Sequence, residues 1–334
     1  MKRVVFFALV ISMPAFVSAQ QESCRLVFYN VENLFDTINE PGKRDAEFLP
    51  EGDRRWNGYK YYQKLQKLYK ALAAAKEWED LTFIGLCEVE NKMVVSHLLY
   101  KTPLFQDGYQ IIHQDSPDER GVDVALLYRP ENFELTDYEY LPVSFSFDPT
   151  DKTRDILYAK GVLFGSDTLH LYVNHWPSRY GGYMKTKPKR EYAAQVLAAH
   201  IDSIAKQNPD AQIIVTGDFN DEPTDTGITT LLSNISQTTL KGLLNNKEPG
   251  TTKFRSQWYL FDQIWVSENL TDSTTSLITK NATIGDFPFL LKEDERYGGK
   301  KLDRTYLGPR YVGGTSDHLP VFVDIIKQKP QRHE

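Results

Sequence analysis

Residues 81–91 read LTFIGLCEVEN, a nearly continuous apolar run that ends in the carboxylate of Glu88. A short run of this kind is typical of a strand that is covered on both faces. A second such strand is predicted at 211–216, and Asp218 and Asn220 follow it directly. A carboxylate at the end of a buried strand is costly unless it is paired or bound to a metal. The two stretches therefore predict buried strands whose C-terminal ends place polar side chains in a functional site.

The rest of the chain alternates many further strands with a few helices. Strands are predicted at 25–31, 109–113, 122–128, 157–164, 169–174, 260–266 and 319–326, and amphipathic helices at 59–78 and 190–205. This order predicts two sheets packed together with helices outside. No linker rich in Pro, Gly or Ser divides the chain, so one domain is expected over 20–334. Residues 285–314 are long and irregular, which favours either a functional loop or a plain surface insertion.

Polar residues recur at the ends of the predicted strands. Asn30 follows the apolar residues 26–28 near the end of the first strand, and His175 follows the strand at 169–174. Loops at strand ends on a rigid scaffold are where sites are built, so these residues are expected to converge with Glu88 and Asp218. Carboxylate and amide oxygens suit Mg²⁺ or Mn²⁺ rather than a soft zinc site. The sequence has no Gly-x-Ser-x-Gly elbow and no glycine-rich nucleotide loop.

The first residues are expected to direct export. A charged start at Lys2-Arg3, an apolar run at 4–13 and small residues up to Ala19 indicate a signal peptide over 1–19. No later apolar run is long enough to span a membrane, so we expect a periplasmic or extracellular protein without stable membrane insertion.

The net charge bears on nucleic-acid binding, and the positions of the two cysteines bear on whether they form a disulfide. The net charge of −6 disfavours tight, non-specific nucleic-acid binding, although KTKPKR at 185–190 is a local basic exception. Cys24 and Cys87 are not expected to pair. If Asn30 and Glu88 meet at one site, Cys24 lies about 20 Å back along its strand, and a disulfide needs Cα atoms within about 7 Å.

Six motifs occur in an order that resembles the endonuclease/exonuclease/phosphatase superfamily, whose members are DNase I-like, and in particular its bacterial exported branch. They are FYNVEN with Asn30, LCEVEN with Glu88, VNHWPSR with His175, GDFND with Asp218 and Asn220, FDQIW with Asp262, and SDHLPV with Asp317 and His318. The resemblance runs from residue 25 to about 326. It implies an α/β (α+β) fold, a four-layered α/β sandwich of two mainly antiparallel sheets face to face with helices outside.

The same resemblance implies a role for each matching residue. Glu88 would be the main metal ligand, with Asn30 and Asp317 near the ion, which would be Mg²⁺ or Mn²⁺. Asp218 would position or deprotonate the attacking water. His318, oriented by Asp262, would act on the phosphate, and Asn30, His175 and Asn220 would contact the substrate. Arg179 follows His175 in the same motif, and its position near that residue predicts that it also contacts the substrate.

The expected function is hydrolysis of a phosphate ester by activated water. The leading hypothesis is an exported, metal-dependent phosphodiesterase, such as a nuclease acting on DNA or RNA, working as a monomer. A phosphatase or phospholipase C-like enzyme acting on inositol phosphates or sphingomyelin is the alternative. A non-enzymatic exported binding module is a third hypothesis, which the complete set of polar residues disfavours.

Overall fold

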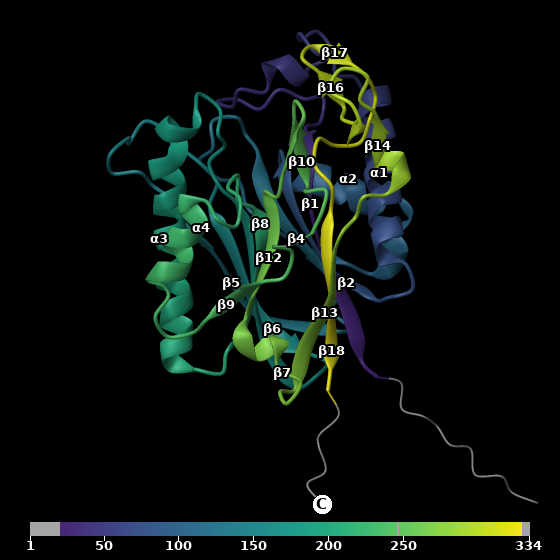
Figure 1. The fold of residues 1–334 in the computed structure, drawn as a ribbon. Coiled ribbons are helices and arrows are strands. Elements are labelled where there is room, and N and C mark those ends of the chain that lie inside the picture. The colour runs from purple at the N-terminus through teal and green to yellow at the C-terminus, as the bar shows by residue number, and fades with distance from the viewer. Residues whose placement is uncertain (1–20, 246, 329–334) are drawn as a thin grey trace, which may run out of the picture.

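The computed structural model describes residues 21–245 and 247–328. The predicted signal peptide over 1–19 lies outside these residues. Two six-stranded sheets dominate the structure, with strand orders β13-β18-β1-β2-β4-β3 and β5-β6-β7-β8-β12-β9 (Figure 1). The first sheet consists of β1 (Ser23–Leu34), β2 (Leu81–Val89), β3 (Gln110–His113), β4 (Asp123–Tyr128), β13 (Leu277–Ile284) and β18 (Val321–Lys327). The second consists of β5 (Phe133–Leu141), β6 (Ile156–Leu163), β7 (Asp167–His175), β8 (Gln212–Asp218), β9 (Leu240–Gly242) and β12 (Asp262–Ser267).

Helices cover the outer faces of both sheets. In Figure 1, α3 (Tyr183–Gln207) and α4 (Thr226–Asn234) flank the second sheet, whereas α1 (Gly58–Lys76) and α2 (Lys92–Tyr100) lie on the opposite flank. A shared core of buried aliphatic and aromatic side chains lies between the sheets and includes Phe28 from β1, Val173 from β7 and Ile264 from β12. The predicted four-layered α/β sandwich is therefore confirmed.

Each sheet contains one parallel pair at its centre, and every other neighbour in these two sheets is antiparallel. The pairs are β1 with β2 and β7 with β8. Parallel strands end at the same edge, so the C-terminal residues of these four strands lie together. The antiparallel neighbours β12 and β18 begin at that edge, and Asp262 at the start of β12 is directly opposite Asp218. This common edge holds the candidate site.

Several elements differ from the sequence-based expectation. Helix α3 begins at Tyr183, so the basic stretch 185–190 is helical rather than a loop. Pro188 lies inside this helix, where proline normally indicates a boundary because it lacks an N–H. The patterns also missed α2, α4, β5 and β13. Short hairpins were missed as well: β10 (Thr252–Phe254) with β11 (Gln257–Tyr259), β14 (Leu291–Glu293) with β15 (Lys300–Leu302), and β16 (Tyr306–Leu307) with β17 (Arg310–Tyr311).

The cysteines are free and buried, as expected. Cys24 lies near the start of β1, whereas Cys87 pairs with Asn30 six residues further along that strand. Burial raises the pKa of both thiols. Among the described residues, no helix is both long and apolar enough to cross a bilayer.

Candidate active site

Asp218 lies at the centre of the edge where the two parallel pairs of strands, β1 with β2 and β7 with β8, end. Its Oδ2 accepts a hydrogen bond from Asn30 Nδ2 at 2.9 Å, and its Oδ1 accepts one from the backbone N–H of Asn220 at 2.9 Å. The side chain is buried, and this burial raises the pKa of Asp218 to about 6. The carboxylate is thus held by one donor from each sheet.

His318 is oriented by a buried carboxylate. Its Nδ1 lies 2.6 Å from Asp262 Oδ2, and its Nε2 lies 3.8 Å from Asp218 Oδ2. Burial by itself would lower the pKa of His318, but the carboxylates of Asp262 and Asp218 outweigh it and raise the pKa well above the usual value. The ring is therefore held as a cation whose Nε2–H points toward Asp218.

His175 occupies the other side of Asp218 and has the opposite electrostatics. Its Nε2 lies 3.8 Å from Asp218 Oδ2 and 3.9 Å from Glu88 Oε1. Burial, reinforced by the charges of Arg154 and Arg120, lowers the pKa of His175 well below the usual value. These opposite pKa shifts favour a neutral His175 and a cationic His318.

The backbone is strained where these strands end. Four residues other than glycine have positive φ there: Glu32 (49°) and Asn33 (52°) in β1, Glu88 (60°) in β2, and Asn220 (50°) after β8. Left-handed backbone in such residues costs of order 1–3 kcal/mol each and clusters at functional sites. At Glu88 the strained turn lets Oε2 accept the backbone N–H of Asn33 at 2.9 Å, with Arg120 Nη2 at 3.5 Å from Oε1.

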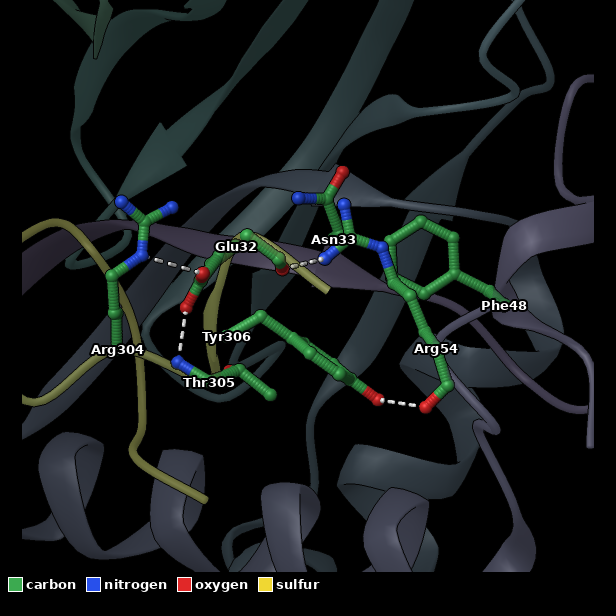
Figure 2. A pocket seen from close by; sticks show the side chains of 8 residues that line it. Glu32, Asn33, Phe48, Arg54, Arg304, Thr305 and Tyr306 are labelled. Carbon is green, nitrogen blue, oxygen red and sulfur yellow. Dashed lines mark hydrogen bonds and ion pairs between the residues drawn. The ribbon is translucent and has the colours of Figure 1, made fainter. Parts of the chain in front are cut away.

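The segment 285–314 is bound to the site by Arg304. Its Nη2 donates to Asp317 Oδ2 at 2.8 Å. Figure 2 shows its Nε donating to Glu32 Oε1, at 3.3 Å, and Thr305 N donating to Glu32 Oε2, at 2.6 Å. Lys64, buried in α1, donates to the Glu32 carbonyl and to Thr305 Oγ1. Of the two interpretations of this segment, the contacts favour the functional loop. Sequence reasoning missed Arg304, although the length and charge of the segment were the available signal. Glu32 lies beside Asn30 in the sequence, but it was not assigned a role in the site.

The donors at this edge fit a hard divalent cation. Carboxylates of Glu32, Glu88, Asp218, Asp262 and Asp317 gather here, and Arg120 and Arg304 are the arginines that pair with them among the described residues. At this edge of the described structure, the ligand atoms close enough together to hold one ion are those of Asp218, Asp262 and His318, and those of Cys87, His175 and Asp218, while Glu88 and Asp317 remain partly exposed at 13% and 28%. Asn30 is already engaged at both ends of its amide, because Oδ1 accepts the N–H of Glu32 at 3.0 Å. Its role in orienting Asp218 is therefore better supported by geometry than metal ligation.

Arg179 points away from the convergence of side chains. Its Nε donates to the Asn220 carbonyl at 2.7 Å, and its Nη2 pairs with Asp221 and Asp225. The structure thus brings together Asn30, Glu88, His175, Asp218, Asn220, Asp262, Asp317 and His318, whereas Arg179 supports the loop that carries Asn220. The Asn220 side chain donates to the Trp176 carbonyl at 3.1 Å, which ties that loop to the one after β7.

Comparison with known proteins identifies the family. The model of the Endonuclease/Exonuclease/phosphatase family matches residues 25–327, nearly all of the chain that the structure describes. The chain belongs to this family. Comparison with curated protein sequences finds no significant match.

Solved structures of the family share the fold at low sequence identity. A family protein from Bacteroides thetaiotaomicron is 16% identical with a TM-score of 0.59, and the match covers 92% of this chain and 99% of that one. A mannosyl-6-phosphatase from B. thetaiotaomicron VPI-5482 is 17% identical with a TM-score of 0.56, covering 90% and 99%. D. rerio TDP2 complexed with a single-strand DNA product is 16% identical with a TM-score of 0.53, covering 91% and 98%.

Proposed function

We propose that this protein is an exported, divalent-metal-dependent phosphoesterase that cleaves phosphodiester bonds by attack of water. The observation that carries the proposal is the position of Asp218 Oδ2. It lies 3.8 Å from the Nε2 atoms of both His175 and His318, at the edge where the two sheets meet. Export is proposed from the sequence of residues 1–19, which lie outside the described structure. The monomeric state is likewise proposed from the sequence.

Asp218 is the group suited to remove a proton from the attacking water. A water is a weak nucleophile, and a carboxylate within hydrogen-bond reach increases its reactivity. Asn30 Nδ2 and the N–H of Asn220 fix the orientation of the carboxylate, so that it does not rotate away when it accepts the proton. The two donors come from different sheets, and the sandwich therefore positions the base.

The two histidines would act differently on the phosphate. Charge accumulates on the phosphate oxygens in the transition state, and a fixed cationic donor such as His318 stabilises it. His175 is neutral and can donate one hydrogen bond without adding charge. Glu88 and Asp317 would hold Mg²⁺ or Mn²⁺, which supplies further positive charge to the phosphate oxygens when bound.

The nature of the ester is the open part of the proposal. Family neighbours include a sugar phosphatase and a protein bound to a DNA product, which supports phosphate-ester hydrolysis in general and leaves monoester hydrolysis as the second candidate. The deciding assay is a panel of plasmid DNA, RNA, a generic phosphodiester, inositol phosphates and sphingomyelin, each with Mg²⁺, with Mn²⁺ and with EDTA. We expect turnover that EDTA abolishes and either ion restores.

Three substitutions test the assignment of the site. Glu88→Ala, Asp218→Asn and His318→Ala should each lower kcat by about 10²–10⁴-fold, because each removes a metal ligand, a base or a charge-stabilising donor. Glu51→Ala and Asp53→Asn are matched controls, since both side chains are exposed and neither forms a hydrogen bond or ion pair with Glu88, Asp218 or His318 in the described structure. Retained activity in all three site variants, with folding verified by circular dichroism, would refute the proposal.

A further inference from the structure

A basic groove lies beside the candidate active site. It is a cavity of about 370 Å³ between the hairpin β10–β11 and the hairpin β14–β15, and Asp317 lines its inner end. Its lining includes five lysine or arginine side chains and two aspartates. None of these basic residues was part of the site expected from the sequence. We call this cavity the hairpin groove.

Both aspartates of the hairpin groove are already neutralised by their own partners. Lys253 Nζ donates to Asp294 Oδ2 at 2.9 Å, and each of these two side chains is only 5% exposed. Arg304 Nη2 donates to Asp317 Oδ2 at 2.8 Å. The remaining basic residues therefore determine the charge that the groove presents to a ligand.

Arg255 and Arg296 supply that charge. Both are exposed, and neither forms an ion pair within the described part of the chain. Each guanidinium lies against its neighbouring aromatic ring, at 5.2 Å from the centroid of Phe254 and 5.1 Å from that of Tyr297. Such contacts restrict the planar group and leave its N–H donors free. Lys301 adds a third positive charge and lies 4.0 Å from Asp294.

The hairpin groove is fixed in position relative to the site. Thr252 pairs with His318 in an isolated bridge, and Thr252 Oγ1 donates to the Asp317 carbonyl at 2.8 Å. Lys253 Nζ also donates to the carbonyls of Gly298 and Lys300, which ties the two hairpins together. A ligand in the groove would therefore lie next to Asp317 without any rearrangement of the backbone.

We propose that the hairpin groove binds a second phosphate of the substrate, next to the phosphate whose ester bond is cleaved. This proposal deepens the proposed function and rests on it. Guanidinium groups bind phosphate through paired N–H donors, and a cleft lined by one sign of charge concentrates ligands of the opposite sign. The second phosphate can belong to the next nucleotide of a strand or to a bisphosphorylated small molecule, since the chemistry of recognition is the same.

Matched pairs of substrates measure the contribution of the second phosphate. The first pair is the 4-nitrophenyl ester of thymidine 5′-phosphate, with and without a 3′-phosphate. The second pair is glucose 1,6-bisphosphate and glucose 6-phosphate. We expect kcat/KM to be about tenfold higher for the member with two phosphates, in whichever pair the protein hydrolyses. Turnover of the first pair identifies a nucleotide source for the second phosphate, and turnover of the second pair a small-molecule source.

The variant Arg255→Gln/Arg296→Gln tests whether the groove causes this preference. The ratio of kcat/KM within a pair should fall from about tenfold to below about twofold, and a change common to both members does not alter this ratio. Lys185→Gln/Lys280→Gln is the control, because it removes two exposed positive charges that do not line the groove and should keep the ratio. An unchanged ratio in the groove variant would overturn the proposal.

A binding measurement separates failure of this inference from failure of the proposed function. Titration calorimetry of the Asp218→Asn protein compares thymidine 3′,5′-bisphosphate with thymidine 5′-phosphate and needs no turnover. We expect at least fivefold tighter binding of the bisphosphate, lost when Arg255→Gln/Arg296→Gln is added. Equal affinities would reject the groove as a phosphate subsite. The fivefold difference, found together with an unsubstituted protein that hydrolyses no substrate of the panel, would reject only the proposed function.

Discussion

The flank formed by α3 and the hairpin groove both gather basic residues beside the candidate site, but they differ in what those residues contact. On the α3 flank, Arg179, Lys187, Lys189 and Arg190 pair with carboxylates, and exposed Lys185 is the one basic residue of the stretch 185–190 that forms no ion pair within the described part of the chain. In the hairpin groove, Arg255 and Arg296 form no ion pair among the described residues. The α3 flank includes the densest basic stretch in the sequence, yet the groove offers more free positive charge. Charge available to a ligand therefore depends on the acidic residues nearby rather than on the local density of basic residues.

The comparison predicts that substitutions on the α3 flank lower stability, whereas substitutions in the groove change substrate preference. The largest effect is expected at Arg190, whose Nε lies 2.6 Å from Asp221 Oδ1 with both side chains fully buried. Arg190→Leu would leave the Asp221 carboxylate without its closest charged partner and should lower the free energy of unfolding by about 3–5 kcal/mol. Urea unfolding at pH 7 measures it, with exposed Lys185→Gln as control. A loss below about 1 kcal/mol would contradict a structural role.

Arg179 tests whether a basic residue of the α3 flank stabilises the fold or binds substrate, because its position near His175 in the sequence predicted substrate contact. Its side chain is 24% exposed and holds the Asn220 carbonyl together with Asp221 and Asp225. Arg179→Ala should lower the free energy of unfolding by about 2 kcal/mol, through loss of hydrogen bonds between charged groups. Its kcat/KM should fall alike for substrates with one and with two phosphates. A selective loss for the two-phosphate member would instead assign Arg179 to the substrate.

The groove should also respond to salt in a way that the α3 flank does not. Binding of oligothymidylate to the Asp218→Asn protein should weaken as salt rises, with a log–log slope proportional to the number of phosphates neutralised. Adding Arg255→Gln/Arg296→Gln should reduce the steepness of that slope by about 1.4, since each single-strand contact contributes about 0.7. Fluorescence anisotropy from 50 to 200 mM NaCl measures the slope, and identical slopes would remove the difference between the two regions.

The smallest effect is expected at Lys189. Its Nζ pairs with Asp148 and Asp151, whose side chains are 38% and 45% exposed. Lys189→Ala should lower the free energy of unfolding by less than about 1 kcal/mol, because water screens exposed ion pairs. The loss should shrink further in 1 M NaCl, where the screening length is about 3 Å. A loss of stability as large as that expected for Arg190 would show that the difference in burial does not determine how much these two ion pairs contribute to stability.

Much of the fold could be predicted from sequence because its signals are local. The apolar run ending at Glu88 and the strands at 157–164 and 169–174 were found at almost their observed bounds, as β2, β6 and β7. Strand β5 was missed because most of its residues are at least partly exposed, so no apolar pattern marks it. The start of α3 was missed because Pro188 lies inside the helix. Patterns fail where exposure or a single atypical residue conceals the element.

Sequence alone determined the strand-end positions of Asn30, Glu88, His175 and Asp218, since apolar periodicity and the motif order depend on neighbours along the chain. Only the tertiary structure decided what those residues face. Two parallel pairs bring the four strand ends to one edge, and the antiparallel register places Asp262 opposite Asp218. Arg304 joins Glu32 across 272 residues of sequence. The opposite pKa shifts of His175 and His318, and the free charge of the hairpin groove, follow from such distant partners, because electrostatic energy depends on separation in space rather than along the chain.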